Sequence, residues 1–448
     1  MSKYLNIKYV MFLVLLFNVL YCVGIYYVNG KNTDIFLAPD STSYLNPAKA
    51  LLQKGKFLKE VDSQYYEVGR TPGYPILLLP GVLLRIPIIW AIILNIAFNL
   101  ISIWYLYKIC KLFSFSELAS CLLCLLMGIN LHTLNFVGLI LTEIVFITFL
   151  TASLYYYLKA FEEKKLLYFI LSFILSAYLA FIRPIAMYYF IILALYALYK
   201  GLQEHEKIFI KASLLGFLIC STLIGGWICR NKYLAGYPGF SGISATNLAD
   251  YFGAKVISKL DGRDTMKICV ETDSLIQLKM NKMTYPINQH SGIYYKLKGN
   301  YGKSILMSHI PTFAYLYLYG IFKTFVDPIY PHALLGKYSF YDDIISYSRL
   351  SFRTLLKLSW RGWYYIIESL IFLILFIIFC FIIIRYFKFI LKDYKMLILI
   401  LTVLYFIVLG GFHGLGRFRF PVEGIYFIII YNGISKFISQ KKSKHLNK

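Results

Sequence analysis

The chain has 448 residues, of which 59% are hydrophobic and only 15% are charged, and its formal net charge is +24. A soluble domain carries about 25% charged residues, so this composition excludes an ordinary soluble protein. The charge does not indicate nucleic-acid binding, because the lysines lie in short loops between apolar runs and in the C-terminal tail. That distribution orients a multi-pass protein of the bacterial cytoplasmic (inner) membrane.

Ten apolar runs are long enough to cross a ~30 Å hydrocarbon core as helices, which predicts an all-α membrane protein. They cover residues 8–28, 87–107, 118–135, 139–158, 166–182, 184–199, 212–229, 365–385, 395–411 and 418–436. The apolar stretch 72–85 is short for a span, and we expect it to be re-entrant or steeply inserted. The basic loops then lie in the cytoplasm with both termini, and residues 29–71 and 230–364 lie outside.

This topology divides the chain into three parts. Residues 1–229 form an N-terminal transmembrane catalytic module with the outer loop 29–71. Residues 230–364 form a large extracytoplasmic segment, and residues 365–448 form the last transmembrane helices and a basic cytoplasmic tail. The middle segment is rich in tyrosine, at Tyr285, Tyr294, Tyr295, Tyr301 and Tyr330. It is interpreted either as a lid or acceptor-binding loop, or as surface helices around 303–326 with interfacial aromatic residues.

Five arginines lie at span ends that the topology places outside, against the tendency of cationic residues to stay on the cytoplasmic side. They are Arg70, Arg183, Arg230, Arg417 and Arg419. Each one alone is explained by a side chain that reaches the headgroup layer. The group of five favours a phosphate or pyrophosphate ligand, whose oxygens a guanidinium binds in bidentate fashion.

Acidic residues at the same level are fewer. Asp40 precedes a stretch whose apolar positions share one helical face, so we expect a surface helix that holds Asp40 near the membrane plane, or else a plain N-cap. Glu143 opens an apolar run, either as a functional carboxylate or as a first-turn residue favoured by the helix dipole. Glu423 is expected to form a structural ion pair with Arg417 or Arg419.

Other chemistry has little support in the sequence. His132 and His413 lie at outer span ends without metal-ligand spacing, so we expect no zinc site there. No P-loop, dinucleotide fingerprint or GxSxG motif is present, which leaves ATP-driven transport and serine hydrolysis unsupported.

The polar motifs follow a recognisable order along the chain. They are Asp40-x-x-x-Tyr44-Leu45, Arg70-Thr-Pro-Gly-Tyr74-Pro, Leu-Thr-Glu143, Arg183-Pro, Arg230-Asn and Arg417-x-Arg419-Phe-Pro. In this order they resemble bacterial glycosyltransferase family 39, the relatives of protein O-mannosyltransferases and of the lipid A aminoarabinose transferase. The resemblance covers residues 5–235 and, beyond them, mainly the final Arg-x-Arg-Phe-Pro.

The resemblance implies a GT-C fold, with outer-face amphipathic helices and a polyprenyl-phosphate-linked sugar as donor. Transfer to a glycan, lipid or protein acceptor then takes place on the outer face with inversion. Asp40 matches the catalytic base and Glu143 a second acidic position of the catalytic site; if a divalent cation is required, these two are its expected ligands. Arg70, Arg183, Arg417 and Arg419 match basic or adjacent positions near the donor phosphate, and Arg230 is a further candidate for phosphate binding. Further candidates for substrate binding are Tyr44, Tyr74 and Glu423.

Two other classes stay open as alternatives. A polysaccharide polymerase or ligase of related fold also has outer-face arginines, but it uses a pyrophosphate-linked oligosaccharide. A lipid or sugar transporter is expected to carry discontinuous helices and charged residues near mid-membrane. In this chain the polar residues gather at the outer boundary instead, which favours the transferase.

Overall fold

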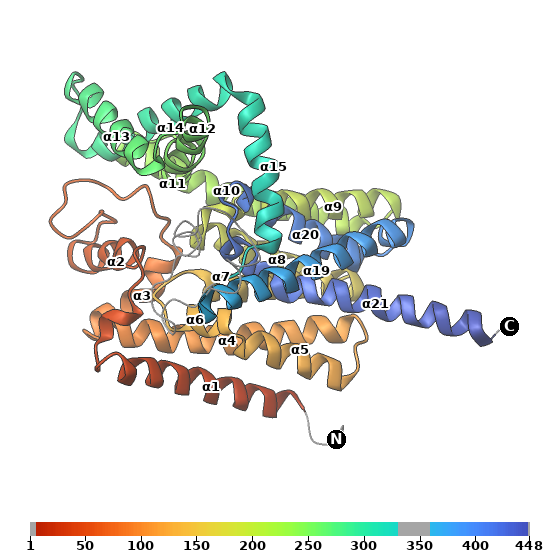
Figure 1. The fold of residues 1–448 in the computed structure, drawn as a ribbon. Coiled ribbons are helices and arrows are strands. Elements are labelled where there is room, and N and C mark those ends of the chain that lie inside the picture. Colours follow the sequence, from red (N-terminus) through yellow and green to blue (C-terminus); the bar gives the residue numbers. More distant parts are fainter. Residues whose placement is uncertain (1–5, 330–358, 447–448) are drawn as a thin grey trace. The chain divides into compact units, whose positions relative to one another are not determined.

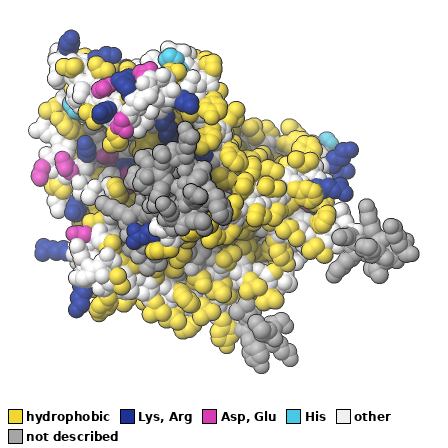
Figure 2. Space-filling model, viewed as in Figure 1, with side chains coloured by type: hydrophobic (Ala, Val, Ile, Leu, Met, Phe, Trp, Pro, Cys, Tyr) yellow, Lys and Arg dark blue, Asp and Glu magenta, His cyan; other side chains and the backbone are white. Residues whose placement is uncertain are grey.

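The computed structural model describes residues 6–329 and 359–446, and within these ranges every regular element is a helix. Tyr330 and the rest of 330–358 lie outside the described residues, as do the last two residues of the tail. Seven described helices are long and apolar enough to cross a membrane, or up to nine if two bent pairs each count as one span. Figure 2 shows a broad hydrophobic surface. Many large apolar side chains are exposed, among them Leu195, Leu218 and Ile377. These features confirm a multi-pass, all-α membrane protein.

The chain forms two compact units that are interleaved along the sequence. Unit 1 comprises Met1–Phe36, Leu106–Gly138 and Gly320–Lys448, and unit 2 comprises Leu37–Tyr105 and Leu139–Tyr319. Each unit is described by itself. The sequence-based boundaries at residues 229 and 364 concern membrane sidedness, and they stay a prediction.

Unit 1 is built from long apolar helices joined by short turns. Its complete elements are α1 (Ile7–Val28), η1 (Thr33–Phe36), α5 (Glu117–Ile129), α6 (Leu131–Val137), α19 (Trp360–Ile390), α20 (Tyr394–Gly410), η5 (Gly411–His413), η6 (Gly416–Phe418), η7 (Phe420–Val422) and α21 (Glu423–Leu446). α1 packs against α5, and α21 packs against α19 and α20 (Figure 1). At the first interface a Cβ on Gly128 would lie 2.4 Å from Val14 Cγ2, so the two helices approach closely only because position 128 is glycine.

The predicted span 118–135 is broken in the structure. α5 and α6 are bent by 50° relative to each other. Asn130 separates them in an extended conformation, with φ −63° and ψ 158°, and its side chain accepts a hydrogen bond from the Thr133 N–H at 2.7 Å. Asn130 is therefore the N-cap of a new helix, which stops α5.

Unit 2 contains the remaining helices. They are α2 (Thr42–Lys54), α3 (Gly73–Leu83), most of α4 (Pro87–Leu112), α7 (Glu143–Glu163), α8 (Leu166–Ile182), η2 (Pro184–Ala186), α9 (Tyr189–Gln203), α10 (Lys207–Ala235), α11 (Ile243–Thr246), the π-helix η3 (Asn247–Gly253), α12 (Ala254–Asp261), α13 (Thr265–Asn281), η4 (Ile287–Gln289), α14 (His290–Ser308) and the start of α15 (Ile310–Val326). α7 packs against α8, and α10 against α8 and α9. Charged side chains gather over α12–α14, the green helices of Figure 1.

Several predictions about local elements of unit 2 can be compared with the helices. The amphipathic helix after Asp40 is confirmed as α2, whose Tyr44, Leu45 and Ala48 are buried. α8 was predicted as a span but has only 17 residues, and α3, within 72–85, has 11, so both are among the shorter apolar helices. The helices expected around 303–326 are α14 and α15, which are bent by 101° at Ser308–Ile310.

Candidate active site

Asp40 forms an ion pair with Arg70 in unit 2. Arg70 Nη2 lies 2.6 Å from Asp40 Oδ1, and the side chains are 21% and 38% exposed, respectively. Arg70 Nη1 also donates to the Tyr44 hydroxyl at 3.2 Å, and the guanidinium lies over the Tyr44 ring. The Asp40–Arg70 pair is therefore accessible to a ligand, and the Arg70 guanidinium packs against the Tyr44 ring.

The turn that carries Asp40 is fixed by its neighbour Ser41. The Ser41 hydroxyl accepts a hydrogen bond from the Ala38 N–H at 2.8 Å and donates to the Ile140 carbonyl at 2.9 Å. This joins the turn before α2 to the segment just before α7. The carboxylate of Asp40 consequently lies beside the start of α2 without acting as its N-cap, which is Ser41.

Glu143 and Arg183 form a second, more buried pair. Arg183 Nη1 lies 3.4 Å from Glu143 Oε1, with the glutamate side chain fully buried and the arginine side chain 14% exposed. Glu143 is the first residue of α7, and Arg183 follows the last residue of α8. The carboxylate therefore has a favourable place at a helix N-terminus and a charged partner, and its functional role stays a prediction.

The Tyr44 hydroxyl lies close to both ion pairs. Burial raises the pKa of this hydroxyl, and four charged groups act on it, Arg70, Glu143, Asp40 and Arg183. The ring of Tyr74 packs edge-on against the Tyr44 ring with centroids 5.2 Å apart. Six of the residues singled out in the sequence are thus brought together in unit 2, although their substrate roles stay predictions.

Arg230, at the C-terminal end of α10, has a different environment. Its Nη1 donates to the Glu67 carbonyl at 2.8 Å and its Nη2 to the Phe57 carbonyl at 3.0 Å. The guanidinium also lies over the Trp227 ring, 4.7 Å from the centroid. Arg230 therefore fastens the loop 57–67 to α10, and its predicted phosphate contact stays a prediction.

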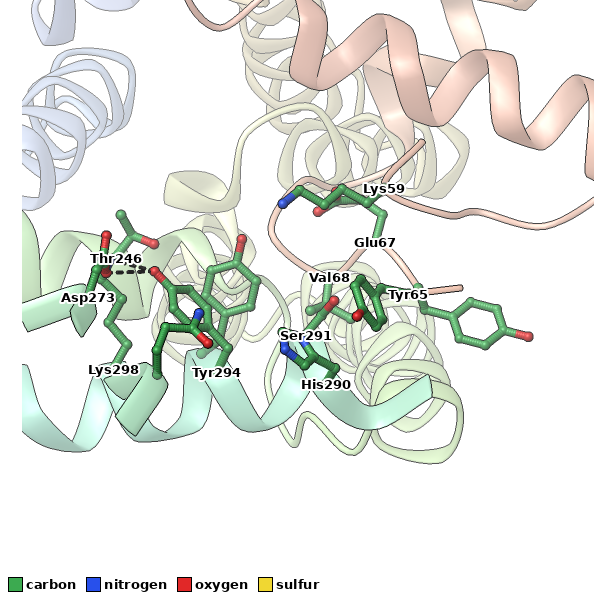
Figure 3. A pocket seen from close by; sticks show the side chains of 13 residues that line it. Lys59, Tyr65, Glu67, Val68, Thr246, Asp273, His290, Ser291, Tyr294 and Lys298 are labelled. Atoms are coloured by element: carbon green, nitrogen blue, oxygen red, sulfur yellow. Dashed lines mark hydrogen bonds and ion pairs between the residues drawn. The ribbon is translucent and has the colours of Figure 1, made fainter. Parts of the chain in front are cut away.

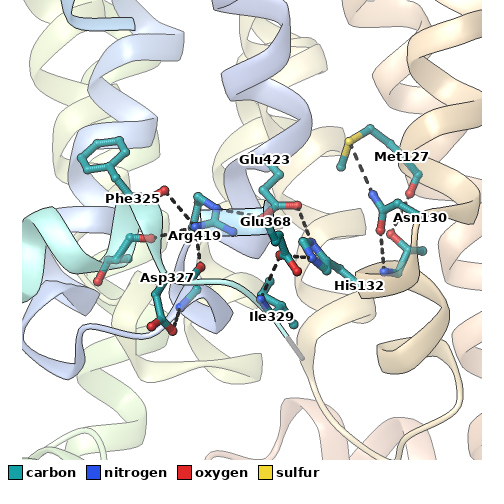
Figure 4. Close-up of polar contacts among 12 residues, drawn as sticks. Met127, Asn130, His132, Phe325, Asp327, Ile329, Glu368, Arg419 and Glu423 are labelled. Atoms are coloured by element: carbon teal, nitrogen blue, oxygen red, sulfur yellow. Dashed lines mark hydrogen bonds and ion pairs between the residues drawn. The ribbon is translucent and has the colours of Figure 1, made fainter. Parts of the chain in front are cut away.

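The remaining candidates lie in unit 1, where Arg419 is completely buried (Figure 4). Arg419 Nε donates to Glu423 Oε1 at 3.0 Å, which confirms the predicted ion pair of Glu423. Its Nη1 donates to three carbonyl oxygens at the end of α15, those of Thr324, Phe325 and Asp327. A cation at a helix C-terminus satisfies carbonyls that have no partner within the helix. Arg417 lies just before it, in η6.

Unit 1 also contains a charged contact that the sequence did not reveal. His132 Nε2 lies 2.5 Å from Glu368 Oε1, and its Nδ1 lies 3.3 Å from Glu423 Oε2. Figure 4 shows this histidine beside the Arg419 pair. The prediction for His132 considered only metal ligands nearby in the sequence. Its two carboxylate partners, Glu368 and Glu423, lie 236 and 291 positions away in the chain.

A cavity of about 380 Å³ opens in unit 2 beside the Asp40 pair (Figure 3). Its lining residues are Lys59, Tyr65, Tyr66, Glu67, Val68, Thr246, Asp273, Gln277, His290, Ser291, Tyr294, Tyr295 and Lys298. Glu67 Oε1 accepts a hydrogen bond from the Arg70 N–H at 2.7 Å, so one wall of the cavity continues directly into the Asp40–Arg70 pair. Burial raises the pKa of Glu67. Two of the tyrosines, Tyr294 and Tyr295, belong to the aromatic-rich segment noted in the sequence.

No protein-family model matches this chain, and no curated protein is significantly similar to it. Within residues 6–329 and 359–446, no three His, Cys, Asp or Glu side chains are arranged as a metal-binding group.

Proposed function

We propose that this protein is a glycosyltransferase with a GT-C-type helix bundle in the cytoplasmic membrane. It moves a sugar from a polyprenyl-phosphate donor to a hydroxyl of a glycan, lipid or protein acceptor on the extracytoplasmic face, with inversion. The observation that carries the proposal is the cluster around Tyr44. There a partly exposed carboxylate, Asp40, is paired with Arg70, and the buried Arg183–Glu143 pair acts on the same tyrosine hydroxyl.

Inverting transfer needs a base that takes the acceptor proton. Asp40 is the candidate, because its side chain is 38% exposed and lies in a loop rather than within a helix. A base must come within hydrogen-bond distance of the hydroxyl that it deprotonates. The acceptor oxygen forms a bond to the anomeric carbon, the bond from that carbon to the phosphate oxygen breaks, and the proton moves to Asp40.

The leaving polyprenyl phosphate takes the bonding electron pair, so negative charge grows on its oxygens. Arg70 and Arg183 supply fixed positive charge at this place, and a site of low dielectric strengthens their effect. Glu143 is fully buried against Arg183, which assigns it a positioning role: it orients the guanidinium and does not touch the substrate. A lipid-linked donor also explains why such a site is built on membrane helices.

The test is the variant Asp40→Asn, expressed in cells that lack the native protein. We expect it to insert normally and to lower the amount of glycan product by about 10²- to 10⁴-fold, the usual contribution of a general base. Asp62→Asn is the matched control, since Asp62 is an exposed carboxylate in the same outer loop and should leave the product unchanged.

The readout is mass analysis of cell-envelope glycans with and without the protein. Full product from Asp40→Asn removes Asp40 from the mechanism. Identical glycans in cells with and without the native protein contradict the transferase proposal as a whole. A product longer by a whole oligosaccharide, rather than by one sugar, identifies a polymerase or ligase instead.

A further inference from the structure

The cavity beside Arg70 has the size and the walls of a small-molecule site. Its volume of about 380 Å³ lies within the range of ~300–1,000 Å³ that is common for ligand pockets. One wall is the loop 59–68, and the opposite wall is formed by α13 and α14 (Figure 3). None of the lining residues lies in one of the seven single-helix membrane spans, and those of α14 belong to the first half of the bent pair α14–α15.

The charges in the lining balance. Two cations, Lys59 and Lys298, face two carboxylates, Glu67 and Asp273, which gives zero net charge with neutral histidine. A ligand with a net charge of either sign meets a like charge in this pocket. A neutral ligand with many hydroxyl groups matches it, because a hydroxyl can donate to a carboxylate such as Asp273 and can accept from Lys59.

The carboxylate of Asp273 is held in a fixed position. It accepts hydrogen bonds from the Tyr294 hydroxyl at 2.8 Å and from Lys298 Nζ at 2.6 Å. Lys298 is almost completely buried and is also paired with Asp250 of the π-helix at 2.7 Å. The side chain of Asp273 is 47% exposed, so this oriented carboxylate remains open to a ligand.

Aromatic side chains provide the apolar part of the pocket. Tyr65 is stacked on the His290 ring, with centroids 4.5 Å apart and planes at 18°. Tyr66, Tyr294 and Tyr295 add further ring surface to the lining. Aromatic rings with a polar end combine a flat apolar face with a hydrogen-bonding group, which suits the C–H face and the hydroxyls of a sugar ring.

The loop wall is fixed before any ligand binds. The Gly242 N–H donates to the Val68 carbonyl at 2.7 Å, and Arg230 holds the Glu67 carbonyl from the other side. Close packing also excludes a larger residue at Gly69, where a Cβ would lie 2.5 Å from the Tyr295 hydroxyl. Such pre-organisation lowers the entropic cost of binding.

We propose that this pocket binds a neutral monosaccharide unit of the acceptor. Its ligand class, a neutral polyhydroxylated ring, follows from the lining alone, whereas the role as acceptor site rests on the proposed function. The hydrogen bond from the Arg70 backbone N–H to Glu67 links the pocket wall to the residue that pairs with Asp40, which suits an acceptor site next to the proposed base. The donor's lipid tail stays in the bilayer, away from these walls.

The test is saturation-transfer NMR on the full-length protein in lipid nanodiscs, with the methyl glycosides of glucose, galactose, mannose and N-acetylglucosamine as probes. We expect at least one probe to bind, and Tyr65→Ala and Asp273→Asn each to weaken its binding about tenfold, the loss of one strong contact. Tyr233→Ala is the control, since Tyr233 is an exposed tyrosine of the same unit outside the pocket and should leave binding unchanged. The asparagine variant preserves side-chain shape, so it separates lost binding from lost folding.

The proposal is overturned if none of the four glycosides binds, or if neither variant weakens binding. Tighter binding of glucose 6-phosphate than of methyl glucoside contradicts the neutral ligand class. Asp40→Asn should still bind the glycoside, which distinguishes the two proposals. If the sugar binds but no glycan is transferred in cells, the transferase proposal and the acceptor role of the pocket are both wrong. If glycan is transferred but no sugar binds, only the pocket proposal is wrong.

Discussion

Replacing Arg419 with alanine should destabilise the fold, although the sequence placed this residue near the donor phosphate. Its guanidinium is completely buried, pairs with Glu423 and donates to three carbonyls at the end of α15. It also lies over the Phe372 ring, 3.4 Å from the centroid. The alanine variant therefore removes the cation and leaves several acceptors without their donor.

The size of the effect follows from these contacts. Removing one partner of a buried ion pair costs about 3–5 kcal/mol, and each carbonyl left unsatisfied adds on the order of 1 kcal/mol. With three such carbonyls, we therefore expect a loss of roughly 6–8 kcal/mol. For a unit of about 150–250 residues, this lowers the melting temperature by roughly 10 °C or more.

The assay is thermal unfolding of the purified protein in detergent, with Arg417→Ala as the comparison. Arg417 is only half-buried, so its variant should melt close to the native protein. If Arg419→Ala instead melts within about 2 °C of the native protein but loses donor binding, the structural role assigned to Arg419 is wrong. In that case the guanidinium acts on the phosphate, as the sequence suggested.

Two further predictions concern unit 2. Gly292→Ala should sharply reduce the yield of folded protein, because an added Cβ would lie 1.8 Å from the Ala235 carbonyl oxygen. The measurement is size-exclusion chromatography, and a profile that matches the native protein would contradict this packing. Burial raises the pKa of Glu67 above its ordinary 4.5, so the folded state binds this proton more tightly than the unfolded state does. That contribution to stability is fully present below pH 4.5 and is lost as the pH rises through the raised pKa. The melting temperature of Glu67→Gln should not show this decline as the pH rises. If the melting temperatures of both proteins change with pH in parallel, the role assigned to Glu67 is wrong.

Much of the fold was predictable because its signals are local. Apolar runs of span length and the helical periodicity after Asp40 predicted most of the long helices and α2 correctly. The bend between α5 and α6 was missed, since the residues on both sides of Asn130 are mostly apolar and only the cap geometry reveals the break. The helix pair α14–α15 was expected on the surface, because two segments joined at 101° do not form one continuous apolar run.

The candidate site was predictable only in part. The membrane topology placed Asp40, Arg70, Glu143 and Arg183 at one level, and the structure gathers them around Tyr44. His132 was assigned no role, because its carboxylate partners are more than 200 positions away and leave no local pattern. Residues that belong to one charged contact but lie far apart in the chain are visible only once the helices are packed.

The hydrogen-bond partners of each arginine indicate whether its guanidinium can bind the donor phosphate. The Arg230 guanidinium donates to two backbone carbonyls, and Arg419 donates to three carbonyls and to Glu423, so a ligand that took these donors would leave a loop, a helix end or a buried carboxylate without its partner. Arg70 and Arg183 are partly exposed and face carboxylates. A phosphate offers oxygens of the same kind, so it can bind the same guanidinium groups beside those carboxylates. The donor phosphate is therefore expected at Arg70 and Arg183, where its departure leaves each arginine with the carboxylate that held it before.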